Sequence, residues 1–284
     1  MLYLENIPQI GCEFINDGRA MTEKKEGKNP VIRVRSLYKK FDSLPVINGV
    51  DLDVLPGDVV VIMGPSGGGK STFLRCLNFL EEPSSGIIEI DGVEINVEES
   101  ASNRNERIRA LRRRAAMVFQ EFNLFTHMNV LDNIIEGAVT VKGLPKEKAI
   151  SKAEGLLDEM GLLEKRDVFP SLLAAGEQQQ VAIARSLCME PQIMLFDDPT
   201  SALDPSLVSA LVGVMKRLVN AGIAMIIVSN EPFLVRNIAN RAIFFEDGVW
   251  VEMASPDELL SNPKKERTRQ FLSRISLKEV SISQ

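Results

Sequence analysis

The sequence predicts an α/β fold with a mostly parallel sheet. Three segments, DVVVIM (58–63), QIMLFDD (192–198) and IAMIIVSN (223–230), each contain a continuous apolar run, which is typical of strands covered on both faces. Segments with helical spacing, such as KEKAISKAEGLLDEMGL (146–162), lie between these runs. Strands that alternate with helices along a chain usually form one parallel sheet with helices on its faces.

Residues 1–30 show no regular apolar pattern and end in a polar run rich in Lys, Glu and Gly. We therefore expect a flexible N-terminal extension. Met21, within this run, is a second candidate for the first residue of the chain. The extension has no basic stretch followed by an apolar one, so we expect no secretory signal.

Strand and helix patterns follow in order after residue 30. VIRVRSLYKKF (31–41) and INGVDLDVL (47–55) alternate apolar and polar residues, as half-buried strands do. GIIEIDGVEI (86–95) predicts two short strands around an Asp-Gly turn. Residues 146–187 have helical spacing, and RAIFFEDGVWVEM (241–253) returns to buried strands.

Composition and charge exclude several classes of protein. The chain has 284 residues, 45% of them hydrophobic, and a net charge of −6, which argues against a nucleic-acid binder that depends on phosphate neutralisation. Its 3 cysteines are widely spaced, so we expect no disulfide framework and a reducing cytoplasm. No apolar run approaches the roughly 20 residues that span a bilayer.

A phosphate-binding loop is the strongest motif in the sequence. VVVIMGPSGGGKSTFLRCL (59–77) contains G-x-x-x-x-G-K-S between a buried strand and an amphipathic helix, an order that argues against a chance glycine-rich turn. Backbone N–H groups of such a loop converge on phosphate at a helix N-terminus. We expect nucleotide contacts from Gly64, Pro65, Ser66, Gly67, Gly68, Gly69, Lys70, Ser71 and Thr72.

A carboxylate on a second strand would complete a metal site with this loop. IMLFDDPTSALDP (193–205) places Asp197 and Asp198 directly after an apolar run, at the strand end where open α/β sheets bind ligands. The Ser71 hydroxyl and the Asp197 carboxylate are hard oxygen ligands, which Mg²⁺ prefers. The sequence therefore predicts a Mg²⁺ site beside the phosphate loop.

The motifs together resemble a known family. The phosphate loop, VFQEFNLF (118–125), QQQVAIARSL (178–187) and DDPTSALD (197–204) have the order and spacing of ATP-binding-cassette ATPases. LRRRAAMVFQEFNLFTHMNVLDNI (111–134) and NPKKERTRQFLSRI (262–275) are similar to the ATP-binding subunits of polar amino acid importers, the glutamine- and histidine-type group.

This resemblance implies one cassette over residues 31–275 and a C-terminal tail over 276–284. The cassette would have a P-loop NTPase (RecA-like) core, an antiparallel β-subdomain and an inserted helical subdomain at about 125–187, which docks on the membrane subunit. His127 is expected to be a loop residue near that interface rather than a catalytic base. The basic run at 104–114 is most simply a solvated helix face.

The resemblance also implies ATP and Mg²⁺ as cofactors, and it implies roles for single residues. Phe41 matches the aromatic residue that stacks on adenine, although a core aromatic is the plain alternative. Gln120 matches the glutamine that senses Mg²⁺ and γ-phosphate and relays to the permease, so Ser71, Gln120 and Asp197 form the expected metal site. Asp204 matches a loop that faces the opposite protomer of a dimer.

The chain departs from the family pattern at the signature segment. The family reads L-S-G-G-Q-Q-Q-R where this chain has LAAGEQQQ (173–180). In the family this helix N-terminus caps the γ-phosphate held by the other subunit, so Ala174 and Gly176 are the expected contacts. Ala174 has no hydroxyl, and Ala175 adds a methyl group where glycine allows close approach. Glu177 adds negative charge, and Gln180 lacks the positive charge that the family has there.

Two departures lie at the expected site of hydrolysis. Asp198 replaces the glutamate that acts as general base and is shorter by about 1.5 Å, and Asn230 replaces the switch histidine. With Gln120, these two residues are the expected catalytic groups. Because the loop motif is intact while these positions differ, we expect nucleotide binding with weakened turnover. Pairing with an intact partner would leave each dimer site with one altered half.

The expected function is to energise a polar amino acid importer. Such a subunit would lie peripherally at the cytoplasmic face of the inner membrane, as a dimer of ATPase subunits on two permease subunits, and act indirectly with a solute-binding protein. The alternative is a nucleotide-binding regulatory module that hardly hydrolyses ATP. A cassette protein of DNA repair or translation is disfavoured by the single cassette and the acidic balance, and we expect no nucleic-acid partner.

Overall fold

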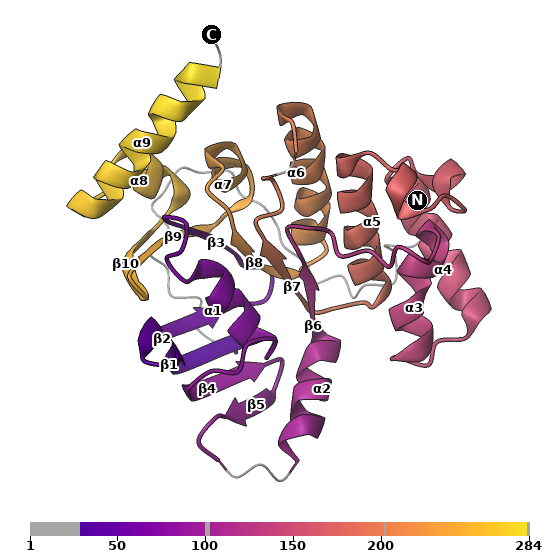
Figure 1. Ribbon diagram of the computed structural model, residues 1–284, viewed down its shortest axis with the longest axis horizontal. Coiled ribbons are helices and arrows are strands. Elements are labelled where there is room, and N and C mark those ends of the chain that lie inside the picture. Colours follow the sequence, from indigo (N-terminus) through magenta and orange to yellow (C-terminus); the bar gives the residue numbers. More distant parts are fainter. Residues whose placement is uncertain (1–28, 100–102, 202, 283–284) are drawn as a thin grey trace.

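In the computed structural model, the chain is described over residues 29–99, 103–201 and 203–282, and the side chains up to residue 275. The predicted extension at 1–30 therefore lies almost wholly outside the described residues. Figure 1 shows a central sheet with helices on both faces, a second sheet beside it, and a separate group of helices on the far side. Within the described ranges, no helix is both long and apolar enough to cross a bilayer.

The central sheet has 6 strands in the order β10-β9-β3-β8-β7-β6. All neighbouring pairs are parallel except β10 with β9. The predicted α/β class with a mostly parallel sheet is thus confirmed. The strands are β3 (Val59–Met63), β6 (Ala115–Val118), β7 (Ile193–Asp197), β8 (Ala224–Val228), β9 (Arg241–Glu246) and β10 (Val249–Ala254).

Strands β3, β7 and β8 are buried on both faces, as their continuous apolar runs predict, but the prediction of buried strands over 241–253 is wrong for β10, an edge strand whose Val249 and Met253 are exposed. In β3, Val60 and Ile62 belong to one core cluster, whereas Val59, Val61 and Met63 belong to another on the opposite face. This period of two is the pleat of a strand. Helix α1 (Lys70–Leu77) packs in the first cluster, and α6 (Pro205–Asn220), α7 (Pro232–Ile238) and α8 (Pro256–Ser261) pack in the second.

The second sheet is antiparallel, with 4 strands in the order β2-β1-β4-β5. The strands are β1 (Ile32–Phe41), β2 (Leu44–Val54), β4 (Ser85–Ile90) and β5 (Val93–Asn96). Asp91 and Gly92 both have positive φ, 46° and 76°, the backbone that a two-residue hairpin turn requires. The predicted Asp-Gly hairpin is confirmed.

The separate helices are α3 (Val130–Thr140), α4 (Lys146–Glu159) and α5 (Ala175–Cys188), with short 3₁₀ turns η1 (Leu163–Lys165) and η2 (Pro170–Leu172). We call α3–α5 and these turns the helical unit. It has a core cluster of its own. Helix α5 serves two cores, because Val181 and Ala184 face this cluster while Ala182 and Ile183 face the central sheet.

The C-terminal helix α9 (Glu266–Ile282) runs across the expected boundary between cassette and tail. Phe271 contacts Phe244 of β9, with ring centroids 5.0 Å apart, and buried Glu252 accepts hydrogen bonds from the N–H groups of Lys264 and Lys265 just before the helix. The expected boundary at 275/276 thus falls inside a helix, which is physically reasonable because extending a helix that is already nucleated costs little.

The basic run forms α2 (Arg104–Arg114). It is not merely a solvated face, because Arg112 donates from Nε to the Asn78 carbonyl at 3.0 Å and from a terminal nitrogen to the Phe79 carbonyl at 2.8 Å. These carbonyls directly follow α1, where a helix leaves acceptors unsatisfied. Arg112 therefore ties the end of the phosphate-loop helix to α2.

Replacing Arg112 with Met should lower the free energy of unfolding by about 1 kcal/mol, because two carbonyls lose a charged donor. Urea denaturation measures this change. The matched control is Arg113→Met, since Arg113 is exposed and has no side-chain partner among the described residues. Equal effects of the two substitutions would contradict the proposed capping of α1.

Candidate functional site

The phosphate loop lies between β3 and α1, pressed against two other strands. A Cβ on Gly64, whose φ is 152°, would lie 2.0 Å from the Phe245 carbonyl oxygen of β9. A Cβ on Gly69, with φ of 95°, would lie 2.7 Å from the Val46 carbonyl oxygen of β2. Only glycine fits either position, in conformation and in space. The loop backbone is therefore fixed by the strands beneath it.

Lys70 lies at the start of α1 with its ammonium group inside the loop. Its Nζ donates to the carbonyls of Gly64 at 2.8 Å and Pro65 at 2.7 Å. Burial lowers the pKa of Lys70, and the charges of Asp198 and Asp197 oppose that shift. The loop thus holds a cation whose partners are neutral carbonyls, so it is suited to an anion.

Ser71 and Asp197 meet beside this cation, as the sequence predicts for a metal site. The Ser71 hydroxyl donates to Asp197 Oδ1 at 2.6 Å, and Asp197 is buried at the end of β7. Arg75, which the sequence analysis missed, reaches Asp197 Oδ2 at 3.3 Å. Its signal was available, because Arg75 follows Ser71 by four residues on one helix face.

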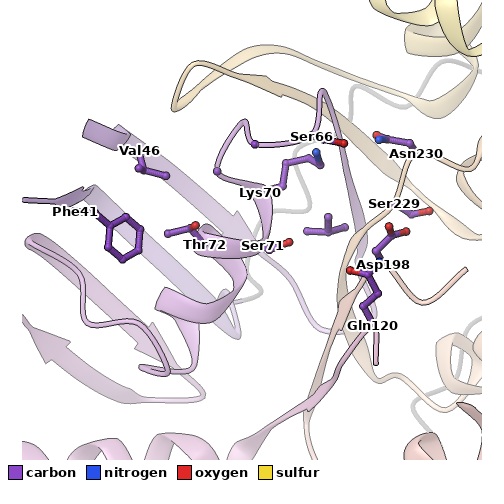
Figure 2. A pocket seen from close by; sticks show the side chains of 13 residues that line it. Phe41, Val46, Ser66, Lys70, Ser71, Thr72, Gln120, Asp198, Ser229 and Asn230 are labelled. Carbon is purple, nitrogen blue, oxygen red and sulfur yellow. The ribbon is translucent and has the colours of Figure 1, made fainter. Parts of the chain in front are cut away.

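A cleft of about 430 Å³ opens over the loop. Figure 2 shows Lys70, Asp198, Gln120 and Asn230 around it, with Phe41 at its far side. The predicted residues that line it are Phe41, Ser66, Gly67, Gly69, Lys70, Ser71, Thr72, Gln120, Asp198 and Asn230. Val46, Val228 and Ser229 also line the cleft and were not predicted. The other predicted loop residues, Gly64, Pro65 and Gly68, are not part of this lining.

Asp198 follows β7 with a left-handed backbone, φ 46°. Its N–H donates to the Val228 carbonyl at 2.9 Å, so the turn is tied to β8. Burial, and then the neighbouring charge of Asp197, raise the pKa of Asp198, while Lys70 acts in the opposite direction. A carboxyl whose pKa is raised in a cleft is a candidate proton acceptor.

Gln120 reaches the cleft from the segment after β6. Its Nε2 donates to Ser201 Oγ at 3.1 Å, and the Ser201 hydroxyl donates to the Asp198 carbonyl at 3.2 Å. The amide nitrogen is therefore engaged, which leaves Oε1 as the end available for a metal. With Ser71 and Asp197, this set offers oxygen donors only, as Mg²⁺ prefers.

Asn230, at the predicted switch position, supports the loop directly. Gly64 N–H donates to Asn230 Oδ1 at 3.0 Å. Because that N–H can only donate, the amide oxygen faces the loop and the NH₂ group is the remaining donor. Ser229 beside it shares a hydrogen bond of 3.1 Å with Thr200. A local pattern could not reveal these contacts, since they join segments that meet only through the sheet.

Phe41 lies at the end of β1 and is 42% exposed. It is therefore not a core aromatic, the plain alternative. The Lys39 ammonium lies 4.4 Å from the centroid of its ring, a cation–π distance, which occupies one part of the ring surface. The exposed remainder of the ring borders the cleft.

Comparison with known proteins identifies the family. Residues 47–201 match the family model for ABC transporters, a range that contains the phosphate loop, Gln120 and Asp198. The chain belongs to the ABC transporter family. It is 47% identical over 246 residues to the L-cystine transport system ATP-binding protein TcyN of Escherichia coli K12, an alignment that covers 87% of this chain and 98% of that protein.

Two further matches extend this ABC assignment. The arginine/ornithine transport ATP-binding protein AotP of Pseudomonas aeruginosa is 43% identical, over 85% of this chain and 97% of AotP. A bacterial ABC transporter cassette solved as a dimer superposes with a TM-score of 0.71 at 29% identity, covering 79% of this chain and 98% of that structure. The chain is thus an ABC ATPase cassette of nearly the full length of its relatives.

The signature segment of this ABC ATPase lies away from its own cleft. Figure 1 shows α5 and α1 on opposite sides of β7, and neither Ala174 nor Gly176 lines the cleft. A Cβ on Gly176 would lie 2.7 Å from the Leu207 side chain of α6. Asp204 caps α6 by accepting from the N–H groups of Ser206 and Leu207, which gives that residue a structural role.

Glu177 folds back on the start of α5. Its carboxylate accepts from the Ala174 N–H at 3.1 Å and forms an ion pair with Lys165. The Lys165 ammonium, together with the Ala174 N–H, holds the pKa of the Glu177 carboxyl below its usual range. The negative charge that the sequence places at this helix start therefore has a cation beside it, and the pair is close to neutral.

Asn230→Asp should weaken ATP binding by about ten-fold or more, because a carboxylate can still accept from Gly64 N–H but brings negative charge to the cleft. Asn230→Ala removes the loop contact without adding charge and should weaken binding less. Titration calorimetry with Mg·ATP separates the two. Equal losses would show that the Asn230 amide does not face the phosphates.

Glu177→Gln should cost at most about 1 kcal/mol at neutral pH, as exposed ion pairs do. Since the folded-state pKa of Glu177 is lowered, its contribution is present above the unfolded pKa and is lost as pH falls through the folded one. The stability difference between wild type and variant should therefore shrink below about pH 4. Thermal unfolding across pH measures it.

The control for this experiment is Glu164→Gln, because Glu164 is exposed and has no side-chain partner among the described residues. Its substitution should have little effect at any pH. A Glu177→Gln difference that persists unchanged in acid would mean that the ion pair with Lys165 contributes nothing to the folded state.

Proposed function

We propose that this ABC ATPase binds Mg·ATP in the cleft and energises an importer of polar amino acids. The observation that carries the proposal is the intact phosphate loop and its neighbouring carboxylate: Lys70 lies inside the loop, and the Ser71 hydroxyl lies 2.6 Å from Asp197 Oδ1. The relatives named for cystine and for arginine/ornithine transport support amino acids as the class of solute.

Each part of the nucleotide has a proposed partner. The loop N–H groups and the Lys70 ammonium would hold the β- and γ-phosphates, and Ser71, Gln120 and Asp197 would hold Mg²⁺. The exposed ring of Phe41 would stack on adenine. When bound, Mg²⁺ would neutralise phosphate charge and polarise the phosphoryl oxygen.

We also propose the assembly in which this cleft works. Helix α5, which starts with Ala174 and Gly176, lies across β7 from α1 (Figure 1), and neither residue lines the cleft; this supports a dimer of ATPase subunits in which each signature faces the other's γ-phosphate. The cassette solved as a dimer supports the same arrangement. The helical unit would dock on permease subunits, at the cytoplasmic face of the inner membrane, with a solute-binding protein acting indirectly.

Hydrolysis should be slow. Asp198 would accept the proton of the attacking water, but its side chain is about 1.5 Å shorter than a glutamate, and a misplacement of about 1 Å can cost on the order of 100-fold in rate. Ala174 has no hydroxyl to donate to the γ-phosphate, and the Asn230 amide can neither take up a proton nor carry a positive charge. The same departures support a regulatory ABC module as the second candidate function.

Phosphate release from four proteins tests these proposals. They are the wild type, a signature repair (Ala174→Ser, Ala175→Gly, Glu177→Gln and Gln180→Arg), a site repair (Asp198→Glu and Asn230→His), and the combination. We expect ordinary ATP affinity with slow turnover in the wild type. The combined repair should raise the rate by more than the product of the separate effects, because these groups act in one closed site.

Lys70→Ala is the control for both phosphate release and ATP affinity, since it removes the cation from the loop. Equal ATP affinity of Lys70→Ala and wild type would overturn the assignment of the cleft. Rapid wild-type turnover, or a combined repair no faster than wild type, would overturn the slow-hydrolysis proposal. No turnover in any of the four, with normal ATP binding, would favour the regulatory module.

A further inference from the structure

The segment after Gln120 has an unusual backbone. Phe122 and Asn123 are consecutive residues with positive φ, 59° and 48°, in the left-handed region that side chains other than glycine disfavour. This segment connects the cleft to α3 of the helical unit. A backbone of this kind persists only where surrounding contacts hold it in place.

Arg185 of α5 supplies one such contact. Its two terminal nitrogens donate to the carbonyls of Phe122 at 3.1 Å and Asn123 at 2.7 Å, and its guanidinium lies 5.5 Å from the Phe125 ring centroid. Burial lowers the pKa of Arg185, and none of the described carboxylates opposes that shift. A desolvated charge must be compensated by hydrogen bonds, and here this one segment provides them.

Asn133 of α3 supplies the second contact. It is fully buried. Its Oδ1 accepts from the Phe125 N–H at 2.7 Å, and its Nδ2 donates to the carbonyls of Phe125, Met128 and Asn129 at 3.0, 3.1 and 2.9 Å. The amide therefore uses both its donor and its acceptor capacity on the same segment.

We infer that Arg185 and Asn133 are positioning residues for Gln120, because they fasten the segment from Phe122 to Asn129 to two helices of the helical unit. If the segment separated from α5, half-buried Arg185 would lose both of its carbonyl acceptors and its contact with the Phe125 ring, and Phe122 and Asn123 would lose the contact that holds their left-handed backbone. The segment and the helical unit therefore move together. Loss of either contact would let the segment, and with it Gln120, leave its place at the cleft.

This inference rests on the proposed role of Gln120 at Mg²⁺ and the γ-phosphate, and a double-mutant cycle separates the two. The full-length chain is compared as wild type, Gln120→Ala, Arg185→Gln and the double variant. Titration calorimetry gives the ratio of the dissociation constants of Mg·ADP and Mg·ATP for each. That ratio reports contacts to the γ-phosphate alone.

We expect Gln120→Ala to lower the ratio by about ten-fold, the loss of a hydrogen bond to a charged group. Arg185→Gln should lower it nearly as much although it touches no nucleotide. Arg185→Gln should have no further effect when Gln120 is already Ala, because residues that act through one another are not additive. Arg185→Lys keeps the charge but not the pair of hydrogen bonds to two carbonyls. Its ratio should therefore lie between those of wild type and Arg185→Gln.

The matched control is Arg217→Gln on α6, because Arg217 is exposed and has no side-chain partner among the described residues; its ratio should equal that of wild type. Additive effects, or an unchanged ratio in Arg185→Gln, would overturn the inference and leave the role of Gln120 intact. An unchanged ratio in Gln120→Ala would overturn both. If thermal unfolding shows that Arg185→Gln does not fold, Arg185→Lys takes its place in the cycle. The same results, an additive effect or an unchanged ratio, would then overturn the inference.

Discussion

The site depends on the close approach of the phosphate loop to the strands beneath it. Gly64 lies against the Phe245 carbonyl of β9, and Gly69 lies against Val46 of β2, so neither position has room for a side chain. This contact fixes the start of α1 over the carboxyl ends of the parallel strands. Ser71 is thereby carried to Asp197 at the end of β7. The loop and the metal site are thus two results of one packing constraint.

Charge in the cleft is arranged around this rigid frame. Lys70 and Arg75 lie on the α1 side, while Asp197 and Asp198 lie at the end of β7, and burial shifts the pKa values of Lys70 and Asp198 in opposite directions. Such an arrangement favours a ligand that carries both an anion and a cation. The altered signature segment belongs to another surface, where Lys165 accompanies Glu177.

Much of the fold could be predicted, because apolar runs and a strict loop motif encode it locally. Asp197 was predictable for the same reason, since it directly follows the apolar run of β7. The contact of Asn230 with Gly64 depends instead on the parallel pairing of Ile62 with Val228, which no local pattern encodes. Arg75 was overlooked although its helix spacing was visible. The expected tail boundary falls within helix α9, because no local pattern marks an end of the helix there.

Helix α5 has a consequence for the modular exchange of parts between related proteins. Its residues Val181 and Ala184 pack in the helical unit, while Ala182 and Ile183 pack against the central sheet, so α5 is a wall shared by two cores. A recombination point within or beside α5 would combine half of each core with foreign side chains. Crossovers would conserve this packing if they kept α5 together with α3 and α4 on one side and with the central sheet on the other. Helices α3 and α4 therefore cannot be inherited independently of the central sheet.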